Sequence, residues 1–81
     1  SAEAFKNYRW NVVLARIYAA RGELENAVRN YQAAIRNQPE MPELYLAVAE
    51  IETRRNNFDA ALKNLDEVLT LTGDAPAHVK K

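Results

Sequence analysis

Residues that could carry acid–base, nucleophilic or metal chemistry are sparse in this chain of 81 residues. His78 is its one histidine, and it has no cysteine. A zinc site needs several His, Cys or acidic ligands, and a catalytic triad needs a histidine beside a nucleophile and an acid. Two glycines are too few for a loop that cradles phosphates. The sequence therefore predicts a protein that is not an enzyme and that uses no cofactor and no metal.

The charged side chains balance, but they are distributed unevenly. The formal net charge is zero, so the basic field that draws proteins to nucleic acids is missing and no nucleic-acid partner is expected. Residues 8–41 carry five basic and three acidic side chains, whereas residues 42–75 carry three basic and seven acidic ones. The first half therefore has a net charge of +2 and the second −4, and the two halves should attract each other.

No apolar run approaches the roughly 18 residues that a membrane span requires, so we expect no membrane insertion. No signal-like segment opens the sequence, which favours a cytoplasmic location.

The apolar side chains follow a repeat of 34 residues. Six apolar positions between residues 22 and 35 return as apolar positions one period later, at the i, i+3, i+4, i+7 spacing of one helical face. The pairs are Leu24 and Phe58, Ala27 and Ala61, Val28 and Leu62, Tyr31 and Leu65, Ala34 and Val68, and Ile35 and Leu69. The repeated element is therefore an amphipathic helix.

Helix breakers divide the chain into four helices, which we expect at residues 2–21, 24–37, 42–55 and 58–71. The first has an apolar stripe of Trp10, Val13, Leu14, Ile17 and Tyr18. Pro76 lies one period after Pro42, and proline suits the first position of a helix, so residues 76–81 are expected to open a fifth helix.

Two turns are expected to need a left-handed residue. Gly22 adopts that conformation without steric cost, and Asn56, one period later, tolerates it better than most residues. Asn57 is then expected to cap the fourth helix.

The combination of paired helices, short turns and a 34-residue period resembles the tetratricopeptide repeat. The matching residues are Leu14, Ala15, Tyr18, Gly22, Leu24, Ala27, Tyr31, Ala34 and Pro39, and then Tyr45, Val48, Ala49, Asn56, Phe58, Ala61, Leu65 and Val68. The resemblance implies a single all-α domain over residues 1–81, in which antiparallel helix hairpins stack as a right-handed α-solenoid. Its repeats would span 8–41 and 42–75, with 76–81 starting a third repeat or a capping helix, and we expect them to belong to a longer array.

The chain departs from the family pattern at two positions that bear on packing. Where the family usually has a large aromatic residue this chain has Asn11, and we expect the adjacent Trp10 either to fill that space or to cover an open N-terminal face. Glu52 stands in a packing position, so it either faces solvent or pairs with a nearby arginine.

In the resembling family, partner peptides bind in a concave groove lined by the first helix of each pair. Carried over position by position, the groove would consist of Arg9, Val12, Arg16, Ala19, Ala20, Glu43, Leu46, Glu50, Thr53, Arg54, Ala77 and Lys80. The resemblance thus implies a protein-interaction scaffold whose partner is a peptide or protein. Family members that bind chaperone C-termini use a Lys and Asn set, which Val12, Arg16, Ala47 and Ala77 replace here, so that partner is not expected.

The charges of the predicted groove leave two alternatives open. Arg9 aligns with Glu43 and Arg16 with Glu50, so these residues either pair with each other or receive a peptide of mixed charge around an apolar anchor near Val12 and Leu46.

The alternative to a peptide scaffold is a structural spacer or self-association segment. Phe5, Tyr8 and Trp10 lie at one open end and the short fifth helix at the other, where further repeats or copies would stack.

Overall fold

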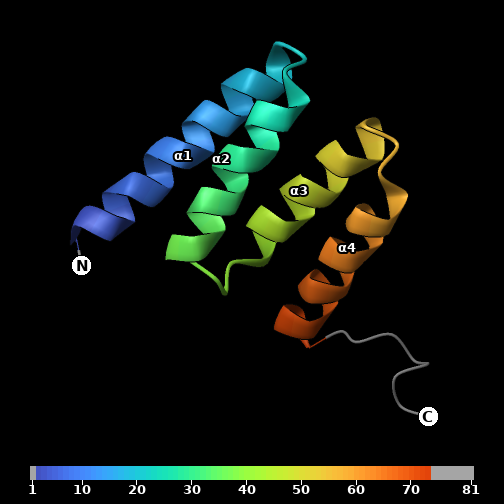
Figure 1. Ribbon diagram of the computed structural model, residues 1–81. Coiled ribbons are helices and arrows are strands. Elements are labelled where there is room, and N and C mark those ends of the chain that lie inside the picture. The colour runs from blue at the N-terminus through green and yellow to red at the C-terminus, as the bar shows by residue number, and fades with distance from the viewer. Residues whose placement is uncertain (1, 74–81) are drawn as a thin grey trace.

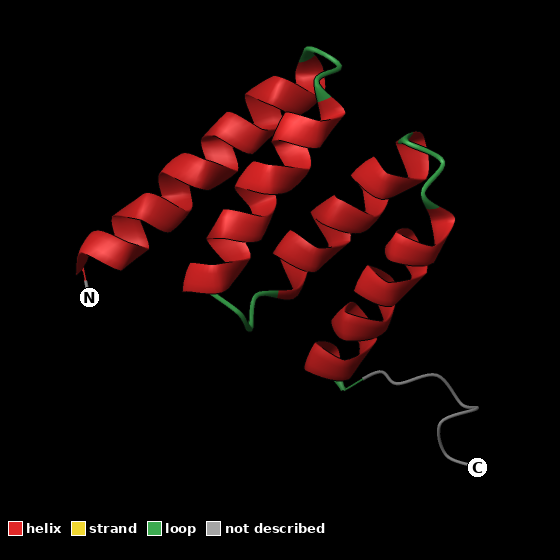
Figure 2. Cartoon of the chain, in the orientation of Figure 1, coloured by secondary structure: helices red, strands yellow, loops and turns green. Residues whose placement is uncertain are grey.

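The structure is a computed structural model that describes residues 2–73, with side chains from residue 8 onward. Its described part contains four helices and no strand (Figures 1 and 2). They are α1 (Ala2–Ala20), α2 (Leu24–Asn37), α3 (Pro42–Arg54) and α4 (Phe58–Thr72). The all-α prediction is confirmed, and each helix ends within one residue of its expected position. The expected fifth helix at residues 76–81 lies outside the described residues.

Consecutive helices run antiparallel and follow one another side by side in chain order (Figure 1). α1 and α2 form one hairpin and α3 and α4 form a second, while α2 packs against α3 to join the two hairpins. The outer helices of the row are therefore α1 and α4.

The same turn closes both hairpins. In the first, Gly22 has a φ of 81° and the Glu23 N–H donates to the Tyr18 carbonyl at 2.9 Å. In the second, Asn56 has a φ of 63° and the Asn57 N–H donates to the Glu52 carbonyl at 2.8 Å. These are Schellman motifs, which satisfy carbonyls at a helix end through a left-handed residue. The predicted left-handed residues are confirmed, and the two motifs lie one 34-residue period apart.

Asn57 differs from expectation. It occupies the position before α4, but its side chain makes no capping hydrogen bond. Its Nδ2 atom donates instead to Glu52 Oε1 at 3.2 Å. The amide therefore contacts the end of α3, and its oxygen does not accept the capping hydrogen bond from the start of α4.

Small side chains allow the two helices of each hairpin to approach closely. Ala15 on α1 and Ala27 on α2 are fully buried, and Ala49 and Ala61 are buried at the equivalent positions of the second hairpin. A larger residue would push the backbones apart, because protein interiors are close-packed.

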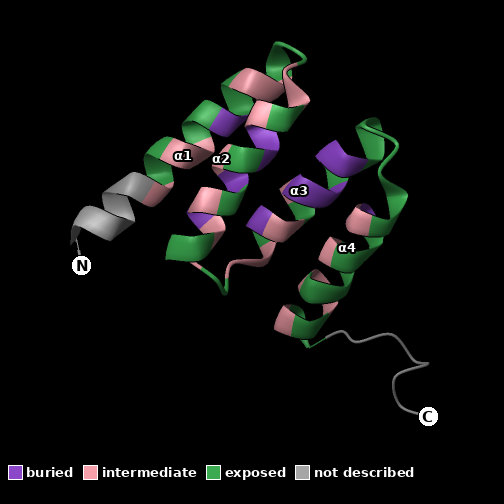
Figure 3. Ribbon diagram, viewed as in Figure 1, coloured by how far each residue is buried: buried purple, intermediate pink, exposed green. Residues whose placement is uncertain are grey.

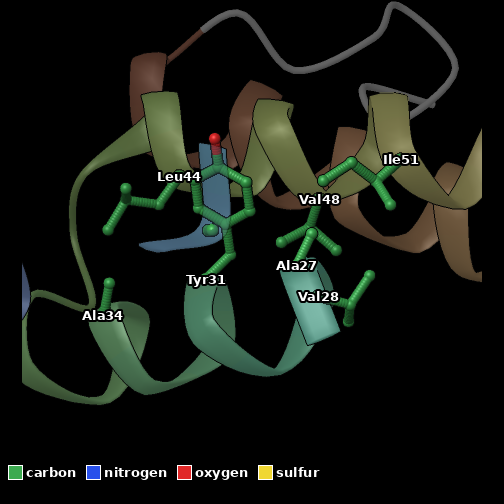
Figure 4. Close-up of a cluster of buried hydrophobic side chains, with 8 residues drawn as sticks. Ala27, Val28, Tyr31, Ala34, Leu44, Val48 and Ile51 are labelled. Carbon is green, nitrogen blue, oxygen red and sulfur yellow. The ribbon is translucent and has the colours of Figure 1, made fainter. Parts of the chain in front are cut away.

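The contact between the hairpins forms the centre of the core. Val28 and Tyr31 project from α2 toward Leu44, Val48 and Ile51 of α3, and all five are buried (Figure 4). Buried residues accordingly concentrate on the two inner helices of the row (Figure 3).

The apolar stripe of α1 is largely exposed. Trp10 is 65% exposed and Ile17 49%, whereas Leu44 and Ile51, one period later, are only 4% and 5% exposed. Trp10 therefore does not fill a packing space within the chain. The reason is positional, because α3 has α2 beside it and no described helix precedes α1.

Glu52 is buried, which settles the alternatives that the sequence left open. Its Oε1 atom accepts hydrogen bonds from Arg55 Nη1 and Asn57 Nδ2, each at 3.2 Å. The carboxylate therefore pairs with a nearby arginine, and it also ties the end of α3 to the start of α4.

Ala27→Leu should destabilise the protein by overpacking the α1–α2 crossing. We expect a loss of about 1–3 kcal/mol in the free energy of unfolding, which a thermal or urea melt would detect. Ala20→Leu makes the same change at an exposed position and should alter stability by less than about 0.5 kcal/mol. Equal melting of Ala27→Leu and the parent would contradict the close crossing.

Glu52→Ala should cost about 1–3 kcal/mol, because it removes the acceptor of two hydrogen bonds at a buried site. Glu25→Ala is the matched control, since it breaks an exposed Arg29–Glu25 pair and should cost less than about 0.5 kcal/mol. Urea denaturation of the two variants tests the difference. Equal losses would show that the Glu52 carboxylate contributes no more than a surface charge.

Candidate functional site

A hollow of about 420 Å³ opens where α1, α2 and α3 meet. Three helices contribute to its walls: Arg16, Ala19 and Ala20 from α1, Tyr31 from α2, and Ala47, Glu50, Ile51 and Arg54 from α3. It lies beside the joint between the two hairpins, so the packing that holds the hairpins together also shapes the hollow.

The space exists because the residues between the two first helices of the hairpins are small. Ala19 and Ala20 on α1 and Ala47 on α3 are methyl side chains, so they leave room between helices whose charged residues reach outward. Ile51 and the ring of Tyr31 supply an apolar floor that is continuous with the core. The result is an apolar base with polar and charged groups at its margins.

The charged side chains of the hollow do not pair with one another. The ion pairs Arg21–Glu23, Arg29–Glu25 and Arg55–Glu52 all lie outside the hollow. Arg16 and Glu50 border the same space without a direct ion pair. Their charges therefore remain available to a ligand, in contrast to the alternative in which they neutralise each other.

Tyr31 belongs to both the core and the hollow. Its ring lies between α2 and α3, and its hydroxyl points away from α2 (Figure 4). Burial raises the pKa of this phenol above 10.0, the positive charge of Arg16 partly opposes the shift, and the negative charge of Glu50 adds to it. At neutral pH the group is a neutral hydroxyl, which can donate and accept a hydrogen bond.

Five residues predicted for the groove line the hollow: Arg16, Ala19, Ala20, Glu50 and Arg54. The other predicted residues that the structure describes lie elsewhere. Val12 is half-buried against the core, and Leu46 is exposed in the first half of α3.

Thr53 is exposed, and its hydroxyl donates to the Ala49 carbonyl at 2.8 Å. Arg9 and Glu43 are also exposed, near the start of the described side chains of α1 and in the first turn of α3. Ala77 and Lys80 lie outside the described residues.

Sequence reasoning missed Tyr31, Ala47 and Ile51 as parts of the hollow. Tyr31 was assigned to the core from the apolar spacing of its helix, which is correct for its ring. The sequence signal that could have identified it is the phenol itself, because a buried tyrosine usually directs its hydroxyl toward a polar partner or water.

Among the described side chains, those of residues 8–73, no group of three or more His, Cys, Asp or Glu residues is arranged to hold a metal ion. Among the same residues, no helix is long and apolar enough to cross a membrane.

Comparison with protein families gives a match to the tetratricopeptide repeat over residues 12–76. The match covers most of the chain and includes all of α2, α3 and α4. No curated protein and no solved structure matches the chain significantly.

Tyr31→Phe should flatten the loss of stability at alkaline pH. An unfolded tyrosine titrates near 10, whereas folded Tyr31 keeps its proton to higher pH, so the unfolded chain binds fewer protons just above pH 10. Stability contributed by this group is therefore complete below pH 10 and falls as the pH rises toward the folded pKa.

Urea denaturation of the parent and Tyr31→Phe between about pH 8 and 11 tests this expectation. The difference in unfolding free energy should be constant at the lower pH values, and the parent should lose stability faster at the higher ones. Other titrating groups are shared and cancel. Parallel curves over the whole range would contradict the burial of the phenol.

Proposed function

The chain belongs to the tetratricopeptide repeat family, and we propose that it is a protein-interaction scaffold that binds a partner peptide or protein in the concave groove of its stacked hairpins. Tetratricopeptide repeats generally mediate protein–protein interactions, and such domains are typically non-catalytic. The proposal assigns the binding to the hollow between α1, α2 and α3. It also divides the domain into repeats at residues 8–41 and 42–75, which the two Schellman motifs one period apart support.

The observation that carries the proposal is the set of unpaired charges around an apolar base. Arg16 and Arg54 offer guanidinium donors, and Glu50 offers a carboxylate across the same space. A ligand that satisfies both signs must itself carry both, because a wholly acidic peptide would meet Glu50 and a wholly basic one would meet Arg16 and Arg54. An extended peptide with both signs of charge therefore fits best.

The apolar part of such a peptide has two places to contact. Ile51 and the Tyr31 ring form the base of the hollow, and Leu46 is an exposed leucine on the same helix as Ile51. An aliphatic or aromatic side chain inserted over Ile51 would be removed from water, which supplies affinity, while the charged residues on either side set orientation and register.

A second candidate is the structural spacer or self-association segment. The specific observation that favours it is the exposure of large apolar side chains on both outer helices of the row, such as Trp10 on α1 and Leu62 on α4. The peptide groove and this candidate use different surfaces, so both are compatible with one molecule.

Arg16→Glu should weaken peptide binding by about tenfold or more, because it replaces a donor with a like charge beside Glu50. Peptides selected from a random displayed library on the full chain, then titrated by fluorescence anisotropy, provide the ligands. Arg36→Glu is the control, since it makes the same change at an exposed position of α2 outside the hollow and should leave affinity within about twofold.

The selected peptides should be enriched in sequences that combine acidic and basic residues with one large apolar residue. The proposal is contradicted if the selected peptides bind Arg16→Glu as tightly as the parent. It is also contradicted if no peptide binds more tightly than about 1 mM.

A further inference from the structure

The two outer helices of the row carry apolar faces that nothing in the described part of the chain covers. On α1 we define the α1 end face as Trp10, Val13, Leu14 and Ile17. On α4 we define the α4 end face as Phe58, Leu62 and Leu65. These seven residues are all exposed, and they lie on opposite ends of the row because α1 and α4 are its first and last helices (Figures 1 and 3).

Both faces are copies of surfaces that are buried inside the molecule. Leu62 is 61% exposed, whereas Val28, which occupies the same position one repeat earlier, is 5% exposed. Leu65 is likewise exposed where its counterpart Tyr31 is buried. The α4 end face therefore repeats the surface that α2 presents to α3.

The α1 end face has the same relation to α3. Leu14 and Ile17 are exposed, while their counterparts Val48 and Ile51 are buried against α2. By contrast, Ala15 is buried in the same way as its counterpart Ala49, because it faces the partner helix of its own hairpin. The change from buried to exposed at Leu14, Ile17 and Leu62 thus falls where one hairpin would meet another.

A second hollow gives independent support for this equivalence. It has a volume of about 350 Å³ and is lined by Val13, Arg16, Ile17 and Ala20 on α1. Moving each of these positions forward by one period gives Ala47, Glu50, Ile51 and Arg54, which form the α3 wall of the first hollow. The hollow on α1 is therefore equivalent to the α3 wall of the first hollow. At the α2–α3 joint, Tyr31 and the preceding helix close that wall into a hollow, and α1 has no such neighbour among the described residues.

We propose that a second copy of this chain stacks head to tail on the first, with the α4 end face of one copy packed against the α1 end face of the next. The contact reproduces the α2–α3 joint of a single chain. Leu65 of the first copy takes the place that Tyr31 occupies within a chain, and it closes the hollow on the α1 of the second copy. Ile17 of the second copy takes the place of Ile51.

Charge determines which ends meet. Residues 8–41, which include most of α1 and all of α2, have a net charge of +2, and residues 42–75, which include α3 and α4, have −4. Head-to-tail stacking joins unlike halves, whereas contacts of α1 with α1 or α4 with α4 join like halves and are disfavoured. The stacking also places Glu50 of one copy opposite Arg16 of the next, as Arg16 and Glu50 already face one hollow within a chain.

This contact is heterologous, because the two surfaces that meet are different. Every assembly therefore keeps one free α1 end face and one free α4 end face. Association should therefore continue from dimer to short chains of copies and not stop at a closed dimer. Each new joint completes one further hollow of the kind assigned to the peptide, so the assembly would lengthen the groove. The proposal nevertheless stands without the peptide, since the end faces carry it and a different measurement tests it.

Sedimentation equilibrium of the full chain from about 10 µM to about 1 mM tests the stacking. The average mass of the parent should rise with concentration above the 9.2 kDa of one chain. Ile17→Glu and Leu62→Glu each place a charge on one end face, and each should weaken self-association by about tenfold or more. Both positions are exposed in the single chain, so the variants should keep the helix content of the parent by circular dichroism.

The decisive experiment mixes the two variants. Ile17→Glu keeps an intact α4 end face and Leu62→Glu keeps an intact α1 end face, so an equimolar mixture can form one joint of the parental kind. The mixture should reach twice the mass of one chain at concentrations where each variant alone is monomeric, and it should grow no further. Gln32→Glu adds the same charge at an exposed position of α2 and should associate like the parent.

Three results would overturn the proposal. The first is an average mass of the parent that stays at 9.2 kDa at every concentration. This result would also be obtained if residues 74–81 of the same chain covered α4. Another is association that neither Ile17→Glu nor Leu62→Glu weakens, because the contact would then lie elsewhere. The third is a variant mixture whose mass stays at that of the separate variants.

Discussion

The structure depends on burial of the apolar face of α2 against α3. A helix hairpin of this kind buries only the seam between its own two helices, where alanines permit a close approach, and its outer faces stay apolar. Val28 and Tyr31 are removed from water only because Leu44, Val48 and Ile51 lie opposite them. Complete burial of side chains of this size contributes about 1.5–3 kcal/mol each, which is a large share of the stability of a small domain. The joint between hairpins therefore holds the fold together.

The same joint creates the hollow. Tyr31 packs its ring into the core and directs its hydroxyl to the edge where Arg16 and Glu50 act on its pKa. Stability and the shape of the candidate site are thus coupled through one side chain, and a change that loosens α2 from α3 would also alter the hollow. The charged residues can stay unpaired at this edge because they remain at the margin of the hollow, where water solvates them, instead of entering the core.

Much of the fold was predictable from the sequence, because its signals are local. Gly22, Asn56 and Pro42 mark helix ends through their backbone preferences, and the repeated apolar spacing identifies which positions face a neighbour. The sequence left two alternatives for Trp10, filling a packing space or covering an open face, and it did not identify Ile17 as exposed. An apolar stripe shows that a face favours burial, but only the arrangement of helices shows whether anything lies against it.

The candidate site was predictable only in part. Arg16, Glu50 and Arg54 follow from the family pattern, since they occupy the inner positions of the first helices. Tyr31 was not assigned to the site, because periodicity assigns a whole residue to a face and cannot separate a buried ring from the hydroxyl at its tip. Asn57 likewise binds Glu52 in place of the α4 end, and that choice depends on a buried carboxylate five residues away.

The described chain is one helix hairpin repeated and joined through α2 and α3. Nuclear Overhauser contacts in dilute solution measure that joint most directly. The structure predicts cross-peaks between the ring protons of Tyr31 and the methyl groups of Leu44 and Val48 (Figure 4). A folded, helical protein that shows none of these cross-peaks would contradict the account.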